Sequence, residues 1–421
     1  MSFNKICIVG LGYIGLPTAA VFAQHNIKVH GVDINQHAVD MINQGKIHIV
    51  EPGLEDVVKS NVDRGFLMAA THAIEADAFL IAVPTPFKND HEPDLSYIKS
   101  ACETIAPQLK QGNLVILEST SPVGATEQMS AWLSESRPDL SFPQQKKDVS
   151  DIRIAHCPER VLPGKVLEEL ISNDRIIGGM SPKCSEQAAL LYKTFVQGQC
   201  IITNARTAEM CKLTENSFRD VNIAFANELS IICDKQNIDV WELIQLANRH
   251  PRVNILMPGP GVGGHCIAVD PWFIVAQNRQ EAQLIQTARK VNDHKPEWVI
   301  NKVKLAISDY LLSQPHKTVS DITIACYGLS FKPDIDDLRE SPALNIALKI
   351  NEIHQGQTVC VEPNITSLPT FASTLQLTAL QSALQVADIH VLLVDHQKFK
   401  SNIPTAGSIV DSKGIWKKLG N

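Results

Sequence analysis

One loop in this 421-residue sequence surrounds a single cysteine with residues that have very little side chain. The stretch GPGVGGHCIAVDP, residues 259–271, holds four glycines and two prolines around Cys266, and Asp270 follows four residues later. Because glycine lacks a Cβ and tolerates positive φ, such a loop can fold tightly and admit a bulky substrate to the thiol. A thiolate is a strong nucleophile toward an aldehyde, so the loop predicts Cys266 as a covalent catalyst; a buried, inert thiol is the alternative. Asp270 would orient a water or a lysine ammonium if a helix begins there.

A second set of residues that could do chemistry lies in a long stretch that favours helix. Residues 206–236 contain no glycine or proline and are rich in helix formers, which predicts one long helix. Lys212, Asn216 and Arg219 follow one another at spacings of four and three residues, so a helix projects them from one face. Spacing alone favours a solvated polar stripe, and a binding face is the alternative.

The N-terminus has the pattern of a dinucleotide-binding turn. KICIVG is an apolar β-rich run, GLGYIGLPTAAVFAQH has the pattern of a tight turn that enters a helix, and IKVHGVD predicts a second strand. Gly10, Gly12 and Gly15 follow the G-x-G-x-x-G spacing, and Asp33 closes the second strand. We therefore expect a pyrophosphate at the helix N-terminus and ribose hydroxyls at Asp33, which favours NAD over NADP. Glycines that serve only helix–strand packing are the alternative.

NAD beside a nucleophilic cysteine predicts oxidation beyond the aldehyde. The expected course is a thiohemiacetal on Cys266, hydride transfer, a thioester and hydrolysis to a carboxylate. Two rival functions remain open. One is a single-step NAD-dependent dehydrogenase of a hydroxy acid or sugar phosphate, which would not need the thiol. The other is a non-enzymatic NAD-binding redox sensor with a switchable thiol.

The composition is that of an ordinary globular protein. Hydrophobic residues make up 44% and charged residues 20%, and the net charge of −7 includes no basic block, which argues against nucleic acid or a membrane as the main partner. The ten cysteines include no C-x-x-C pair, so we expect reduced thiols in the cytoplasm and no metal site. The first apolar run is too short to span a bilayer and lacks a cleavage site, so no secretory signal is expected.

Strand and turn patterns divide the chain into three parts. Apolar runs at 77–84 and 113–120 end in polar, proline-marked loops, where open α/β sheets place their ligand contacts. The pattern of the N-terminus is repeated from residue 318, where ITIACYGLSFKPD predicts a strand and a turn, the next segment predicts a helix, and TVCVEP predicts a second strand. This repeat suggests a second nucleotide site, and a purely structural repeat is the alternative. The expected fold class is α/β, with two doubly wound Rossmann-like domains joined by a long central helix. The expected domains are an NAD-binding domain at 1–205, a central helical domain with the cysteine loop at 206–317, and a nucleotide-binding domain at 318–421.

Five motifs resemble one known family. GLGYIGLP, ESTSPVG, KLTENSFRDVNIAFANE, PGVGGHCIAVDP and YGLSFKPDIDDLRESP span the chain in the order found in the UDP-glucose/GDP-mannose dehydrogenases, to which the sequence is similar. The resemblance implies a four-electron, NAD-dependent oxidation of the C6 hydroxyl of a UDP-sugar through a cysteine thioester. Val269 replaces a usual lysine and His265 a common serine, which resembles the N-acetylhexosamine branch. The implied substrate is UDP-N-acetyl-D-mannosamine, whose uronate is used for enterobacterial common antigen, with UDP-N-acetylglucosamine as the alternative.

The resemblance also implies catalytic roles. It makes Cys266 the thiolate, Lys212 the acid/base or oxyanion-stabilising group, and Asn216 a hydrogen-bond donor to the same substrate oxygen. Asp270 would hold Lys212 and water.

Hydrolysis of the thioester is implied to depend on Glu159 and Thr120, which would position the water. The family often has a second glutamate four residues after the first, and Pro163 stands there in this sequence, so that role rests on Glu159. Contacts to the cofactor are implied for Tyr13, Ile14, Asp33, Thr85, Thr126 and Arg339. Contacts to the substrate, besides those of Lys212 and Asn216, are implied for Arg160, Val161, Arg219, His250, Arg252, Gly263, Phe331, Lys332 and Lys417.

The resemblance implies a homodimer as well. The central helix would form the interface, and Arg252 would reach the neighbouring subunit's site. Apolar positions of this helix, such as Leu213, Val221 and Phe225, are interpreted as core or dimer contacts.

Overall fold

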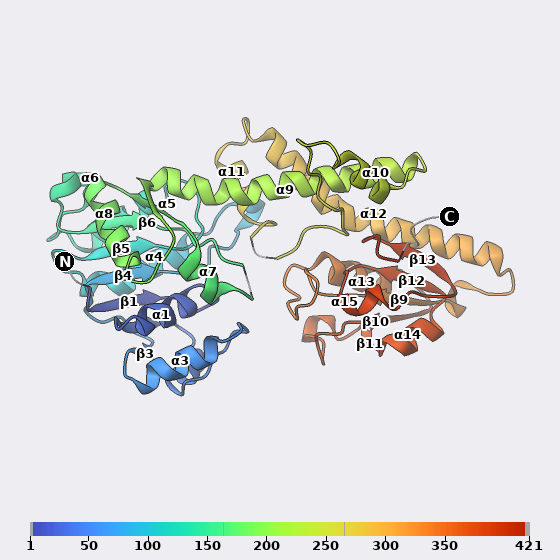
Figure 1. Cartoon of the computed structure of the whole chain (residues 1–421), viewed down its shortest axis with the longest axis horizontal. Coiled ribbons are helices and arrows are strands. Elements are labelled where there is room, and N and C mark those ends of the chain that lie inside the picture. The colour runs from blue at the N-terminus through green and yellow to red at the C-terminus, as the bar shows by residue number, and fades with distance from the viewer. Residues whose placement is uncertain (1–2, 163, 265, 417–421) are drawn as a thin grey trace. The chain divides into compact units, whose positions relative to one another are not determined.

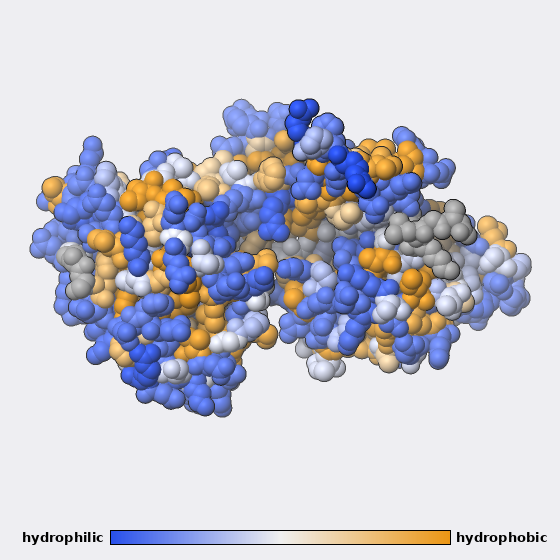
Figure 2. Space-filling model, in the orientation of Figure 1, coloured by the Kyte–Doolittle hydropathy of each residue, from blue (hydrophilic) through white to orange (hydrophobic). Residues whose placement is uncertain are grey.

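The computed structural model describes residues 3–162, 164–264 and 266–416. The chain forms two compact units, residues 1–215 and residues 216–421, and each is described by itself. Hydrophilic residues cover most of the surface seen in Figure 2, and hydrophobic residues gather in patches. Among the described residues, no helix is both long and apolar enough to cross a membrane.

The first unit is built on a sheet that has eight strands within the described residues, in the order β3-β2-β1-β4-β5-β6-β7-β8. The strands are β1 (Lys5–Val9), β2 (Lys28–Val32), β3 (Leu67–Ala70), β4 (Ala78–Ile81), β5 (Leu114–Leu117), β6 (Arg153–His156), β7 (Arg175–Gly179) and β8 (Cys200–Asn204). Neighbouring strands are parallel except β6 and β7, which pair antiparallel with His156 opposite Gly178. As a result, the first residue of β7, Arg175, lies near the carboxyl end of β6.

Helices cover both faces of this sheet, as expected where strands such as AFLI and LVIL are apolar on both sides. Two buried clusters of side chains show this, because one includes residues of α1, α3 and α7 and the other includes residues of α4 and α5. The helices are α1 (Gly15–Gln24), α2 (Gln36–Asn43), α3 (Leu54–Asp63), α4 (Ser96–Ile105), α5 (Ala125–Ser136), α6 (Pro143–Lys146), α7 (Val166–Ser172) and α8 (Pro182–Tyr192), with short 3₁₀ turns at Asn89–His91, Ala106–Gln108 and Lys147–Val149.

A 31-residue helix, α9 (Ala205–Lys235), contains the division between the two units and confirms the long helix predicted from residue 206 (Figure 1). It is followed by α10 (Val240–Ala247), α11 (Asp270–Gln277) and α12 (Gln283–Ser313). Pro296 lies inside α12.

The second unit also contains a parallel sheet, in the order β11-β10-β9-β12-β13 (Figure 1). Its strands are β9 (Thr323–Tyr327), β10 (Gln357–Val361), β11 (Gln376–Leu377), β12 (Ile389–Leu392) and β13 (Ser408–Asp411). Its remaining helices are α13 (Pro342–Ile353), α14 (Leu380–Val386) and α15 (Gln397–Lys400), with 3₁₀ turns at Val319–Asp321 and Thr370–Ala372.

The two sheets have the same central order, since β2 and β4 flank β1 as β10 and β12 flank β9. The repeat suggested by the sequence is therefore a repeat of topology. The predicted fold class, two Rossmann-like α/β sheets and a long helix, is confirmed.

Candidate active site

The glycine turn after β1 has the backbone that its sequence predicts. Gly10 adopts φ +92°, and a Cβ there would lie 2.6 Å from the carbonyl oxygen of Ala82. A Cβ on Gly15 would lie 1.7 Å from the carbonyl oxygen of Gly10, so only glycine lets α1 start this close to β1. A Cβ on Gly12 would meet nothing within 4 Å. The turn is therefore packed on one side and open at Gly12.

The surroundings of this turn fit a dinucleotide. The first turn of α1 has no acidic residue, and Ile14 at its N-cap makes no side-chain cap, which leaves the positive end of the helix for an anion. Asp33 accepts from the amides of Leu11 and Asn35, each at 2.9 Å, one at each carboxylate oxygen. A carboxylate oxygen can accept more than one hydrogen bond, so a ribose hydroxyl could still donate to Asp33. In the loop after β4, the hydroxyl oxygen of Thr85 is buried without a hydrogen-bond partner among the described residues. These groups would hold NAD.

Thr126, expected to contact the cofactor, makes its contacts within the protein. Its side chain is fully buried, and its hydroxyl donates to Glu209 Oε1 at 2.6 Å. The amides of Thr126 and Gly124 also donate to Glu209, at 2.8 and 2.7 Å. Burial raises the pKa of Glu209 above its usual value. The carboxyl of Glu209 thus joins α9 to the start of α5, a role that its sequence position did not reveal.

Glu159, in the loop after β6, belongs to a buried ionic cluster. The guanidinium of Arg175 lies 2.8 Å from Glu159 Oε2 and 3.9 Å from Glu118 Oε1, measured from its two terminal nitrogens. Tyr192 donates to Glu118 Oε1 at 2.6 Å, and its ring centroid lies 4.7 Å from the guanidinium carbon. All four side chains are buried. The antiparallel direction of β7 is what brings Arg175 to the two carboxylates.

The charges of this cluster are unequal. Burial raises the pKa of Glu118 to about 7, Arg175 opposes this shift and Glu159 adds to it. Glu118 therefore exchanges its proton near neutral pH, beside the carboxylate of Glu159. In the sequence, Glu118 was noted only as the first residue of the ESTSPVG motif, and no residue near Arg175 in the sequence indicated a role for it.

Residues next to Glu159 and Glu118 are held by separate contacts. Thr120, half-buried, follows Glu118 in the loop after β5. The amide of Arg160 donates to Glu159 at 2.7 Å, while its guanidinium pairs with Glu215 of α9 at 2.7 and 3.1 Å. Val161 is partly buried against the core of the first unit. The structure thus brings Glu159, Arg160 and Val161 together with β7 and α9.

In the second unit, the cysteine loop leads directly into α11. The carbonyl of Cys266 accepts from the amide of Asp270 at 2.9 Å, so the thiol stands one turn before the helix, as the spacing predicted. Of the ten cysteines, all within the described residues, seven are buried, two are half-buried and Cys266 is exposed. Asp270 is buried and accepts from the side-chain amide of Asn216 at 2.5 Å. This unit therefore combines a reachable thiol with an oriented carboxylate.

The glycines of this loop are needed for packing. A Cβ on Gly263 would lie 2.4 Å from the carbonyl oxygen of Glu340, and Gly264, at φ +79°, would place a Cβ 3.0 Å from the ring of Phe331. The loop therefore lies directly on residues that follow β9. The sequence suggested that the glycines make room for substrate, and the structure shows that they also let the loop reach Phe331.

The candidate residues of α9 differ in exposure. Lys212 is half-buried, Asn216 is buried and Arg219 is exposed. The polar stripe that these residues form was predicted to be solvated, and only part of it is exposed to solvent. Farther along α9, Asn227 accepts from the amide of Gly259 at 2.9 Å. This bond fixes the start of the cysteine loop to α9.

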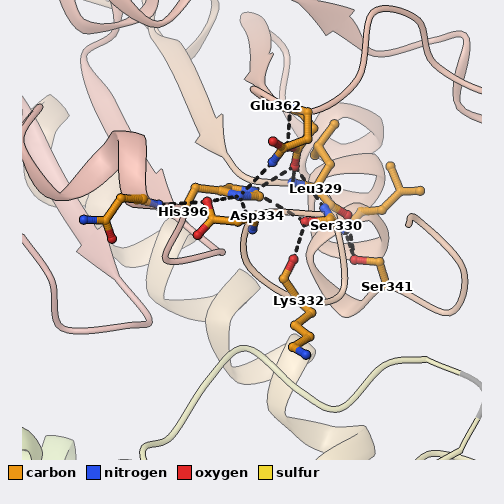
Figure 3. Close-up of polar contacts among 10 residues, drawn as sticks. Leu329, Ser330, Lys332, Asp334, Ser341, Glu362 and His396 are labelled. Atoms are coloured by element: carbon orange, nitrogen blue, oxygen red, sulfur yellow. Dashed lines mark hydrogen bonds and ion pairs between the residues drawn. The ribbon is translucent and has the colours of Figure 1, made fainter. Parts of the chain in front are cut away.

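Phe331 and Lys332 lie in a loop whose backbone is held from several sides (Figure 3). Glu362, directly after β10, accepts from the amides of Leu329 and Ser330 at 2.7 and 3.1 Å. Asp33 occupies the same topological place after β2, where it accepts from Leu11. Figure 3 shows the ammonium of Lys332 directed away from these contacts.

The remaining candidates lie on exposed loops or outside the described residues. His250 and Arg252 follow α10, and the Arg252 amide donates to His250 Nδ1 at 3.3 Å. Arg339 pairs with Asp337, with its nearest nitrogen and oxygen 2.6 Å apart. Three positions named from the sequence, Pro163, His265 and Lys417, lie outside the described residues.

Comparisons with known proteins cover the chain from end to end. Residues 4–196, 206–294 and 325–418 match the NAD binding, central and UDP binding domains of the UDP-glucose/GDP-mannose dehydrogenase family. A UDP-N-acetyl-D-mannosamine dehydrogenase from Yersinia pestis is 64% identical over 99% of this chain and 100% of its own length. An NDP-N-acetyl-D-galactosaminuronic acid dehydrogenase from Ralstonia nicotianae is 60% identical over 99% and 97%. The solved UDP-D-ManNAc dehydrogenase from Pyrococcus horikoshii has a TM-score of 0.87 at 36% identity and covers 99% of this chain and 96% of that one.

Proposed function

Since the chain belongs to the UDP-glucose/GDP-mannose dehydrogenase family, we propose that it oxidises the C6 hydroxyl of UDP-N-acetyl-D-mannosamine to the carboxylate, with NAD as the cofactor. The observation that carries the four-electron chemistry is the exposed Cys266 one turn before Asp270, because a nucleophilic thiol is needed only beyond the aldehyde. The full-length similarity to UDP-N-acetyl-D-mannosamine dehydrogenases supports the choice of sugar.

The chain's own groups act on the substrate carbon and oxygen. Cys266 adds its sulfur to the aldehyde carbon while the carbonyl oxygen takes a proton, which forms a thiohemiacetal. Lys212 exchanges that proton and stabilises negative charge on the oxygen, and Asn216 donates a hydrogen bond to it. NAD, when bound, supplies the hydride acceptor for each of the two oxidations.

Release of the product requires water. Oxidation of the thiohemiacetal leaves a thioester, and attack of water breaks the C–S bond, returns the thiolate and gives the carboxylate. Glu159 and Thr120 position this water, and the ion pair with Arg175 at 2.8 Å supports this by fixing one oxygen of Glu159. Asp270 holds Lys212 and water.

Binding roles follow the two Rossmann-like sheets. The NAD-binding domain, 1–205, contacts the cofactor through Gly10, Gly12, Tyr13, Ile14, Gly15, Asp33 and Thr85, with Arg339 from the last domain. The central domain, 206–317, and the last domain, 318–421, bind the UDP-sugar together with two residues after β6, through Arg160, Val161, Lys212, Asn216, Arg219, His250, Arg252, Gly263, Phe331, Lys332 and Lys417. The cationic side chains among these residues are suited to bind the diphosphate of the substrate and the carboxylate of the product.

The protein acts as a homodimer through α9. Phe218, Phe225 and Ile232 expose 68%, 52% and 42% of their surface and repeat every seven residues, which makes an apolar seam on one face. Leu213, by contrast, is fully buried and belongs to the core. A second copy of the helix fits this seam, and Arg252 would then serve the partner's site.

The cytoplasm is the proposed location. None of the ten cysteines, all of which the structure describes, forms a disulfide, which is typical of a reducing compartment. Use of the uronate in enterobacterial common antigen stays a prediction, since it depends on enzymes that act on the product.

The test is the number of NADH molecules formed per nucleotide sugar consumed. UDP-N-acetylmannosamine, UDP-N-acetylglucosamine and UDP-N-acetylgalactosamine are compared for the unmodified protein, for Cys266→Ala and for a control, Cys200→Ala, at a half-buried thiol. We expect two NADH with UDP-N-acetylmannosamine and loss of turnover only in Cys266→Ala. One NADH, or full turnover in Cys266→Ala, would support a single-step dehydrogenase instead, and no turnover with any sugar would support a redox sensor.

A further inference from the structure

His396 lies at the centre of the polar contacts in Figure 3. It follows β12 and is fully buried. Its Nδ1 lies 2.9 Å from the amide nitrogen of Asp334, and its Nε2 lies 3.0 Å from Glu362 Oε2. An amide N–H can only donate, so Nδ1 is the acceptor and Nε2 carries the proton that is donated to Glu362. The contacts thus define a neutral imidazole that uses both of its nitrogens.

Glu362 is the partner that makes this arrangement specific. Burial by itself would raise its pKa, but hydrogen bonds from His396 and from the amide of Leu329 outweigh burial and hold the pKa of Glu362 below its usual value. The group is therefore a buried carboxylate, which needs every donor that it has. Removing one donor would leave part of its charge without compensation.

The loop between Leu329 and Asp334 is held at both ends by this pair. Glu362 accepts from its first two amides, and His396 accepts from its last. In the middle, the hydroxyl of Ser330 donates to the carbonyl of Lys332 at 2.8 Å. His396 is therefore the group that connects the two ends of the loop that carries Phe331 and Lys332.

The position of this loop in the sheet is where a ligand is expected. In the order β11-β10-β9-β12-β13, the chain continues from β9 toward β10 but from β12 toward β13, in opposite directions, so the strand order reverses between β9 and β12. Open α/β sheets bind ligands outside the carboxyl ends of their strands at such a point. The loop after β9 and His396 after β12 flank it.

We propose that His396 is a positioning residue for the UDP part of the substrate, because its imidazole ties the loop after β9 to Glu362 and so holds Phe331 and Lys332 in a binding geometry. The inference rests on the proposed binding role of that loop. His396 is fully buried, so it acts through the loop and not by touching the ligand.

The experiment compares His396→Leu, which removes both hydrogen bonds, with His396→Gln, which keeps one donor and one acceptor. The control is His390→Leu, since His390 is also fully buried, lies on β12 and bonds to the Tyr327 hydroxyl at 2.8 Å instead of to the loop. The full-length protein is titrated calorimetrically with UDP, and KM, kcat and Tm are measured with the nucleotide sugar.

We expect His396→Leu to weaken UDP binding about tenfold, which is the effect of one lost hydrogen bond to a charged group, and to raise KM equally with kcat within about twofold. His396→Gln should recover part of the affinity, and His390→Leu should lower Tm without changing UDP affinity. Equal loss of affinity in His396→Leu and His390→Leu, or unchanged affinity in His396→Leu, would overturn the proposal. If His396→Leu does not fold, His396→Gln and Glu362→Gln carry the test, and UDP affinity equal to that of the unmodified protein in both would overturn it.

Lys332→Ala separates this inference from the proposed function. Weaker UDP binding in Lys332→Ala with normal binding in His396→Leu would reject the positioning role alone. Normal UDP binding in Lys332→Ala would reject the loop as the substrate site, and the positioning role with it.

Discussion

The side-chain amide of Asn216 donates a 2.5 Å hydrogen bond to the carboxylate of Asp270, although the two residues are 54 positions apart. Both side chains are buried. Since the amide of Asp270 also donates to the carbonyl of Cys266, this bond links α9 to the turn that presents the thiol. Asn216 therefore has a structural partner in addition to its proposed bond to the substrate.

Asn216→Ala should lower both stability and activity. The buried carboxylate of Asp270 would lose a donor, which costs on the order of 2 kcal/mol of unfolding free energy. Urea denaturation and kcat measure the two effects. Asn222→Ala is the matched control, because Asn222 is a half-buried residue of α9 whose side chain bonds locally, to the carbonyl of Phe218, at 2.6 Å. Equal stability of the two variants would contradict the importance of the bond to Asp270.

Gly12→Ala and Gly15→Ala should fail in different ways. A methyl group at Gly12 meets no neighbour within 4 Å, so the variant should fold with a normal Tm and bind NAD more weakly, because the methyl enters the space expected for the pyrophosphate. A methyl group at Gly15 would clash with the carbonyl of Gly10, so this variant should lose stability first. Thermal unfolding and calorimetric NAD titration distinguish the two. Unchanged NAD affinity in Gly12→Ala would place the cofactor elsewhere.

Glu118→Gln should change how stability depends on pH. The pKa of Glu118 is raised by burial to about 7 in the folded protein, whereas the unfolded carboxyl has its usual value near 4.5. Between these values the folded state binds more protons, so this contribution to stability is present at low pH and is lost as pH rises through about 7.

The glutamine variant lacks this loss, so its stability relative to the unmodified protein should increase by on the order of 2 kcal/mol between pH 5 and pH 8. The side-chain oxygen of glutamine can still accept the hydrogen bond from the Tyr192 hydroxyl, so the variant differs from the unmodified protein mainly in its inability to titrate. Urea denaturation at both pH values measures the difference, with the exposed Glu135→Gln as the control. A constant difference across the range would show that Glu118 does not titrate there.

Phe225→Glu should weaken the proposed dimer. A charge in the middle of the apolar seam of Phe218, Phe225 and Ile232 would have to be desolvated at an interface, so we expect dissociation to monomers at micromolar concentration. Light scattering after size-exclusion chromatography measures the mass. Glu135→Lys, at an exposed position of α5 outside the seam, is the control. A monomeric unmodified protein, or a Phe225→Glu variant that stays dimeric, would argue against α9 as the interface.

The sequence by itself determined the local features of this protein. The strand, glycine turn and helix at the N-terminus, the helix at Ala205–Lys235 and the turn from Cys266 to Asp270 were all predictable, because each depends on residues close together in the chain. Motif order also identified the family, as matches to all three of its domains confirm. The roles of individual site residues stay predictions.

The tertiary structure alone decided which distant groups share a contact. Arg175 meets Glu118 and Glu159 because β7 runs antiparallel to β6, and no local spacing encodes the direction of that strand. The hydroxyl of Thr126 is engaged by Glu209, and His396 joins residues of two separate loops. Such contacts depend on strand order and helix packing, which arise from burial summed over the whole core, so the residues involved carry no pattern of their own.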